Sequence, residues 1–197
     1  MDYDDADEAA DQAEANLRLF PPLLLLSAIT SCWHCKAAFT AVALGAHAIE
    51  DEGESMGEVT ETDDMFIIRE LDVMPETLLA ELTARNPSYR RQHSSTVGGS
   101  YYANICPECD RLTGDFFLHA QPGGAFFPTS TAEAAAIRVE RLPYPQPVLV
   151  GGTWSYGTGD FILAHAAVVD SPLGQALETL LPRRASLPGG RPRNPSF

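Results

Sequence analysis

The spacing of hydrophobic residues changes along the chain, and each change marks an expected element. The apolar run from Leu23 to Ile29 reads as a strand that leads into the cysteine-containing stretch SCWHC. The apolar segment AAFTAVALGAHAI, residues 37–49, is expected to be a strand that returns from that turn, and Met65–Leu71 is a third, buried strand. The first part of the chain therefore predicts β structure.

Helical signals follow this β-rich part. Pro75 and Pro87 bracket a segment with Leu78, Leu79 and Leu82 on one face, which predicts a helix. Further helices are expected after two capping patterns, Ser130 with Glu133 and Ser171 with Pro172.

Between these helices, residues 95–127 carry the densest β signal. The stretches SYYANI (100–105) and DFFLHA (115–120) are predicted to be strands because they are rich in aromatic residues. The Gly-rich stretch 151–160, GGTWSYGTGD, lacks the Lys-Ser/Thr pair of a phosphate loop, so we expect a turn between strands.

These elements predict one α+β domain over residues 21–181, preceded by an acidic segment and followed by a tail. Residues 1–20 are acidic and rich in Ala, so they are expected to be helical or disordered. Pro21 and Pro22 stop any helix at the end of this segment. Residues 182–197 are rich in Pro, Gly and Arg and are expected to be disordered. No apolar run is long enough for a membrane span, and the acidic N-terminal flank is unlike a signal peptide, so we expect a cytoplasmic protein with no membrane partner.

The net charge of -14 is concentrated in two segments. Seven acidic residues lie between Asp2 and Glu14 and eight between Glu50 and Asp64, and neither segment contains Lys or Arg. The other 12 acidic residues nearly balance the 13 Lys and Arg. The segment 50–64 is expected to be a solvated loop, and both segments either aid solubility or attract a basic partner. Such a charge distribution disfavours nucleic acid.

The four cysteines form two C-x-x-C pairs, Cys32 with Cys35 and Cys106 with Cys109. A C-x-x-C turn directs two thiolates at one cation, and two such turns complete a tetrahedral shell of four sulfurs. We therefore expect a structural Zn²⁺ ion. The predicted fold is an antiparallel β-sheet built around a zinc-ribbon-like four-cysteine site, with two to three helices.

Other interpretations of these residues stay open. A redox dithiol needs its C-x-x-C at a helix N-terminus, whereas a Gly and a strand pattern follow the second pair. His34 lies inside the first turn and could replace a thiolate, although four cysteines already close the site. An enzyme would need a pocket near the second pair, where Asp115, His119 and Glu108 are the candidates.

The stretch CWHC with its apolar continuation, together with YYANICPECDRLTGDFFLHAQPGGAFF, resembles uncharacterised bacterial proteins with paired zinc knuckles of the zinc-ribbon kind. The resemblance covers residues 31–39 and 95–127. It implies a bacterial cytosolic protein that holds zinc with the four cysteines. The resembled group has no assigned activity, so the resemblance says nothing about what reaction, if any, the protein catalyses. Lys36 and Asp110 stand where such knuckles often have Gly.

The favoured function is that of a non-enzymatic, acidic, zinc-binding protein that binds a basic protein, with a bacterial immunity protein or an antitoxin as examples of this profile. The alternatives are an enzyme with a pocket near the second knuckle and a C-x-x-C thiol redox protein.

Overall fold

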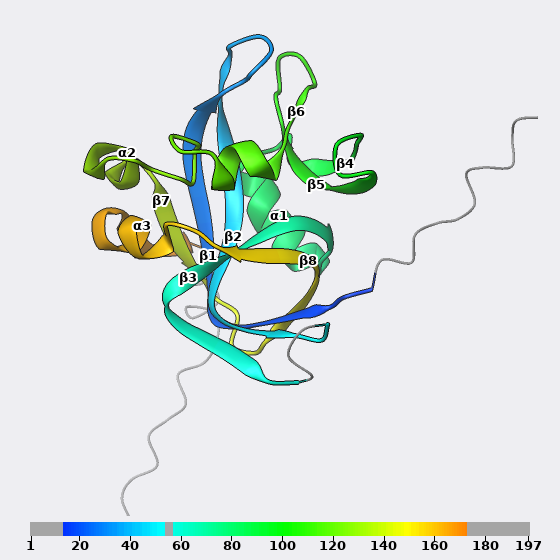
Figure 1. The fold of residues 1–197 in the computed structure, drawn as a ribbon, viewed down its shortest axis with the longest axis vertical. Coiled ribbons are helices and arrows are strands. Elements are labelled where there is room, and N and C mark those ends of the chain that lie inside the picture. The colour runs from blue at the N-terminus through cyan, green and yellow to red at the C-terminus, as the bar shows by residue number, and fades with distance from the viewer. Residues whose placement is uncertain (1–13, 54–56, 173–197) are drawn as a thin grey trace, which may run out of the picture.

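A computed structural model describes residues 14–53 and 57–172 of the chain (Figure 1). The fold is mixed α+β, with mostly antiparallel strands and few helices. Its strands are β1 (Leu17–Ser31), β2 (Ala38–Asp51), β3 (Val59–Val73), β4 (Arg90–Ser94), β5 (Gly99–Ile105), β6 (Leu112–Thr113), β7 (Arg138–Leu142), β8 (Val148–Tyr156) and β9 (Ala167–Asp170). Its helices are α1 (Glu76–Arg85), α2 (Thr131–Ala135), α3 (Gly159–His165) and the π-helical turn η1 (Phe116–Ala120).

Six strands form the larger sheet in the order β2-β3-β8-β1-β7-β9, and β2 also pairs with β1, so that β1, β2, β3 and β8 form a closed ring. The β7–β9 pair is parallel and the other pairs are antiparallel. The smaller sheet contains β4, β5 and β6.

Strand β1 is the central strand of the larger sheet, and its leucines are buried on both faces. Leu23 and Leu25 pack with Leu78 and Leu82 of α1 in one core cluster. Leu24 and Leu26 pack in a second cluster with residues of η1, of α3 and of the segment that connects η1 to α3. Consecutive apolar residues are what a strand covered on both faces requires.

Pro21 and Pro22 lie inside β1, at the point where its neighbour changes. Residues before them pair with β8 and residues after them pair with β7, and the register with β2 shifts between Phe20 and Leu23. Proline has no backbone N–H, so it fits where ladder bonds are interrupted. Leu17–Phe20 are therefore strand, and the prediction that residues up to 20 are helical or disordered is wrong for these four.

Several predicted elements are confirmed. The strands expected at 23–29, 65–71 and 100–105 lie within β1, β3 and β5, and the strand expected at 37–49 coincides with β2 from Ala38 onward. Helix α1 begins after Pro75 and ends before Pro87. Helix α2 begins after Ser130, whose Oγ accepts a hydrogen bond from the Glu133 N–H at 3.3 Å.

Other predictions are wrong. Phe116–Ala120 of DFFLHA form η1 instead of a strand, and residues 151–156 of GGTWSYGTGD belong to β8 instead of a turn. In the acidic segment 50–64, residues 50–51 end β2 and residues 59–64 begin β3, so the loop prediction is wrong for these eight residues. The helix expected after Ser171 and the tail 182–197 lie largely or wholly outside the described residues.

Candidate metal centre

The first cysteine pair forms the turn between β1 and β2. The strands pair up to Ser31 and Ala38, immediately outside the turn. The Lys36 N–H donates to the Cys32 carbonyl at 3.0 Å, and the Cys32 N–H donates to the Ala37 carbonyl at 2.9 Å. Lys36 has a φ of 65°, the left-handed conformation that usually favours Gly. Its Nζ donates to the Trp33 carbonyl at 2.8 Å, which closes the turn from outside.

The second pair repeats this geometry between β5 and β6. The Asp110 N–H donates to the Cys106 carbonyl at 3.0 Å, and the Cys106 N–H donates to the Arg111 carbonyl at 2.9 Å. Asp110 has a φ of 61°, and its carboxylate pairs with Arg90 of β4. Lys36 and Asp110 thus both adopt the left-handed conformation after the second cysteine of each pair, without being Gly.

The two turns bring the four cysteine sulfurs together, although the pairs lie some seventy residues apart in the sequence. All four Sγ atoms lie within 4.8 Å of one another. The distance is 3.5 Å from Cys32 Sγ to Cys109 Sγ and 3.6 Å from Cys35 Sγ to Cys106 Sγ. These distances are too long for disulfides and all four thiols are free. A tetrahedral site with Zn–S bonds of about 2.3 Å has sulfurs about 3.8 Å apart.

The surroundings also suit a bound cation. Cys32 and Cys106 are fully buried and pack against Phe39. Burial alone would raise the pKa of Cys32, but the N–H groups of Cys35 and His34 and the thiols of Cys109 and Cys106 donate to its sulfur, and the pKa falls to about 6.

The pKa values of the Cys35 and Cys109 thiols shift in the opposite direction, upward. Burial, together with hydrogen bonds to neighbouring sulfurs, raises the pKa of Cys109 to about 12, despite a hydrogen bond from the Arg111 N–H. The sulfur cluster on its own therefore resists carrying several negative charges. A metal cation would stabilise all four thiolates, and its binding would release protons.

Contacts outside the sulfur shell hold the two knuckles together. The Trp33 Nε1 donates to the Leu112 carbonyl at 3.0 Å, from the first turn to the strand after the second. Asn104, which is 1% exposed, accepts from the Val42 N–H at 2.8 Å and donates to the Val42 carbonyl at 3.0 Å. Asn86 Nδ2 also donates to Asn104 Oδ1 at 3.1 Å. Sequence reasoning missed Trp33 and Asn104, because no local pattern marks them.

Of the three residues proposed for an enzyme site, Asp115 and His119 are buried and Glu108 is exposed. Asp115 and His119 are buried neighbours, with 3.9 Å between His119 Nε2 and Asp115 Oδ1, and the His119 ring stacks on Phe126. Glu108 is exposed in the second knuckle. His34 is exposed and makes an edge contact with the Trp33 ring, so the geometry gives it no place among the four sulfurs.

Burial is the largest influence on the pKa values of Asp115 and His119. Burial raises the pKa of Asp115 to about 6, although the hydrogen bond from the Glu70 N–H and the positive charge of Arg69 both lower this pKa. Burial also lowers the pKa of His119 to about 3, with a further contribution from Arg69. His119 is thus neutral at pH 7, and its Nδ1 has no hydrogen-bond partner among the described residues.

Comparison with models of known protein families, with curated proteins and with solved structures gives no match. Within the described residues, no helix is both long and apolar enough to cross a membrane.

Proposed function

We propose that the four cysteines hold one structural Zn²⁺ ion in a zinc-ribbon-like centre. The observation that carries this proposal is the convergence of four sulfurs, from two turns of matching geometry, at close to tetrahedral spacing. Four thiolates leave no open position for water or substrate, which is the pattern of structural and not catalytic zinc. The ion would tie the β5–β6 turn to the β1–β2 turn.

Replacing one ligand tests this proposal. In Cys106→Ser we expect metal content to fall from one equivalent to well below half, and the Tm to fall with it, because the energy of a structural site is also folding energy. A loss of about 3 kcal/mol would lower the Tm by roughly 6–12 °C in a domain of this size. Elemental analysis and calorimetry measure the two effects.

His34→Ser is the matched control, since His34 lies in the first knuckle but is exposed. The His34→Ser variant should have the same metal content and the same Tm as the wild type. Protein purified without stoichiometric metal, and a Cys106→Ser variant that melts with the wild type, would contradict the proposal. A Cys32–Cys35 disulfide found in that metal-free protein would favour the redox alternative.

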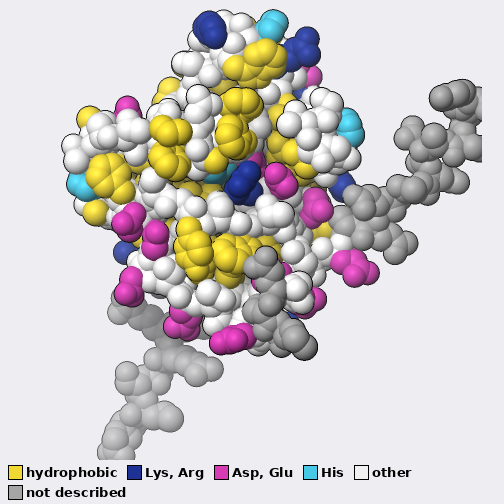
Figure 2. All heavy atoms as spheres, in the orientation of Figure 1, with side chains coloured by type: hydrophobic (Ala, Val, Ile, Leu, Met, Phe, Trp, Pro, Cys, Tyr) yellow, Lys and Arg dark blue, Asp and Glu magenta, His cyan; other side chains and the backbone are white. Residues whose placement is uncertain are grey.

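We further propose that the folded protein is a non-enzymatic binding module for a basic protein, as an immunity protein or antitoxin would be. The support is the acidic end of the β2–β3 hairpin. Glu58, Glu61 and Asp63 are exposed there, and Figure 2 shows Asp and Glu side chains concentrated over the lower half of the molecule. Charges of one sign accelerate encounter with the opposite sign.

A pair of matched variants tests this role. Glu58→Gln/Glu61→Gln should slow association with a basic protein captured from the source organism's lysate by at least about threefold at low salt, and the difference should shrink as salt screens the charges. Glu76→Gln/Glu108→Gln removes the same charge elsewhere on the exposed surface. Stopped-flow rates that are equal for the two variants at low salt would mean that the hairpin serves solubility only.

A further inference from the structure

The four cysteines of the candidate metal centre differ in their exposure to solvent. Cys32 and Cys106, the first cysteine of each C-x-x-C pair, are fully buried. Cys35, the second cysteine of its pair, is exposed, and Cys109 is partly exposed. Each knuckle therefore has one cysteine at the surface, where a small solute can reach it, and one cysteine beneath the surface.

Two short sulfur–sulfur contacts join the knuckles to each other. Cys35 Sγ lies 3.6 Å from Cys106 Sγ, and Cys32 Sγ lies 3.5 Å from Cys109 Sγ. Neither contact joins two cysteines of one turn, and each pairs a surface cysteine with a buried one. Because an S–S bond is about 2.05 Å long, the sulfurs of Cys35 and Cys106 need to approach by only about 1.5 Å to form a disulfide.

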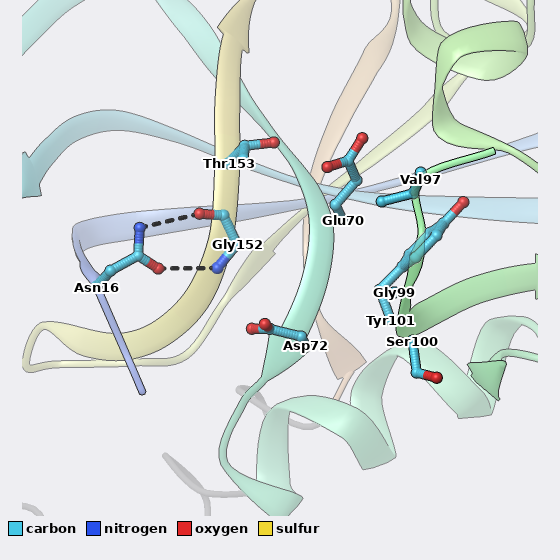
Figure 3. Close-up of a pocket in the computed structure, with 9 residues that line it drawn as sticks. All are labelled: Asn16, Glu70, Asp72, Val97, Gly99, Ser100, Tyr101, Gly152 and Thr153. Atoms are coloured by element: carbon cyan, nitrogen blue, oxygen red, sulfur yellow. Dashed lines mark hydrogen bonds between the residues drawn. The ribbon is translucent and has the colours of Figure 1, made fainter. Parts of the chain in front are cut away.

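The position of the smaller sheet makes a bond between the knuckles consequential. At the end of β5 away from the second knuckle, a cleft of about 200 Å³ lies between the β4–β5 turn and the strands β3 and β8 (Figure 3). Val97 and Ser100 line one side of this cleft, and Asn16 and Gly152 line the other. We therefore expect the contacts near the second knuckle to fix this part of the smaller sheet against the larger one.

We propose that the metal centre is a peroxide-sensitive switch, in which Cys35 and Cys106 form a disulfide between the knuckles and the zinc ion leaves. This inference rests on the proposed zinc site. Exposed thiolates are oxidised before buried ones, so Cys35 reacts first and the buried Cys106 completes the bond. The disulfide keeps the two turns tied together after the metal has gone.

Hydrogen peroxide is the only co-reactant that the step requires. The Cys35 thiolate attacks one peroxide oxygen, the O–O bond breaks, and a sulfenic acid and a hydroxide ion form. The Cys106 thiolate then attacks the Cys35 sulfur, so that the S–S bond forms, the S–O bond breaks and a second hydroxide ion leaves. Two thiolates have then given two electrons to the peroxide. The two thiolates that remain cannot complete a four-sulfur shell around zinc.

The test is a peroxide titration of the full-length, zinc-loaded protein, with released zinc measured by a chromophoric chelator. Zinc release should keep pace with disulfide formation, one ion for each disulfide. After alkylation of the free thiols, chymotrypsin cuts after Trp33 and separates Cys32 from Cys35, and Glu-C protease cuts after Glu108 and separates Cys106 from Cys109. Mass spectrometry should find the Cys35 peptide joined to the Cys106 peptide.

Amide exchange measures whether the disulfide replaces the metal as a link between the knuckles. In the oxidised, zinc-free protein, exchange in β5 should stay within about tenfold of the zinc-bound protein, because the new bond still restrains the second knuckle. Reduced protein treated with a chelator is the control. Its β5 amides should exchange at least about 100-fold faster than those of the zinc-bound protein.

Several results would overturn the switch. These are a disulfide within one turn, a Cys32–Cys109 bond formed without a Cys35–Cys106 bond, zinc release without any disulfide, and exchange in β5 of the oxidised protein that is as fast as in the chelated control. The proposed function fails separately. Protein that holds no zinc before peroxide is added contradicts the zinc site itself, whereas zinc-loaded protein that keeps its metal under peroxide retains the site and removes the switch.

Discussion

At the scale of single residues, Asn104 shows how one side chain can stand in for a strand. Beyond Leu44, β2 no longer pairs with β3 at the end near the first knuckle, so the edge at Val42 needs other partners. The Asn104 carboxamide presents one acceptor and one donor to this edge, as a peptide group would. Because Asn104 lies two residues before Cys106, it links the second knuckle directly to the strand that follows the first.

We expect Asn104→Leu to lower the free energy of unfolding by at least about 2 kcal/mol, because it leaves the buried N–H and carbonyl of Val42 without partners, each at a cost of about 1–3 kcal/mol. Zinc affinity should fall as well, since β5 positions Cys106. Denaturant titration and competition with a chromophoric chelator measure the two losses.

Asn86→Ala is the comparison for this variant. It removes one of the three hydrogen bonds to Asn104 but leaves both bonds to Val42. Asn86→Ala should therefore lower the free energy of unfolding less than Asn104→Leu does, and it should leave the zinc affinity nearly unchanged. If Asn104→Leu binds zinc as tightly as the wild type, the Asn104–Val42 link plays no part in positioning the knuckle.

At the scale of elements, burial on both faces made the early strands predictable. The run of leucines in β1 and the apolar stretch of β2 need cover on each side, and local sequence expresses that need. The α1 helix was equally predictable, because prolines bracket it and Leu78 and Leu82 face the core. The approach of the four cysteines to one another was predictable from their spacing in two C-x-x-C pairs.

Elements that depend on distant partners were not predictable. In η1, Phe116 and Phe117 are 58% and 57% exposed while Leu118 and His119 are buried, which departs from the in-and-out alternation of a half-buried strand. The Phe126 N–H donates to the Leu118 carbonyl at 2.8 Å and holds this turn. Gly152 looked like a turn residue, yet it permits close approach of β8 to β3. The role of Asn104 likewise depends on contacts across the fold.

At the scale of the whole molecule, β2 separates the cysteine cluster from the acidic β2–β3 hairpin. It runs from the knuckle at Ala38 to Asp51 in the acidic hairpin, a length of up to about 45 Å for its 14 residues. Figure 1 shows the knuckle turns together at one end and the β2–β3 hairpin at the other. The two main core clusters contain none of the four cysteines, so the larger sheet has packing of its own.

This separation predicts that metal removal acts locally. The smaller sheet has a small core cluster of its own, Tyr101, Ala103 and Ile105, and only Tyr102 of β5 packs against the main cluster among the described residues, so we expect the proposed metal and Asn104 to hold much of its position. After chelation, amide exchange in β5 should accelerate at least about 100-fold, equivalent to about 2.8 kcal/mol of opening free energy, while β3 and β8 stay protected. Hydrogen exchange with mass spectrometry measures both regions in one experiment, and Cys106→Ser should reproduce the result without chelator. Uniform loss of protection would instead make the metal a requirement for the entire fold, and unchanged exchange in β5 would show that the smaller sheet does not need it.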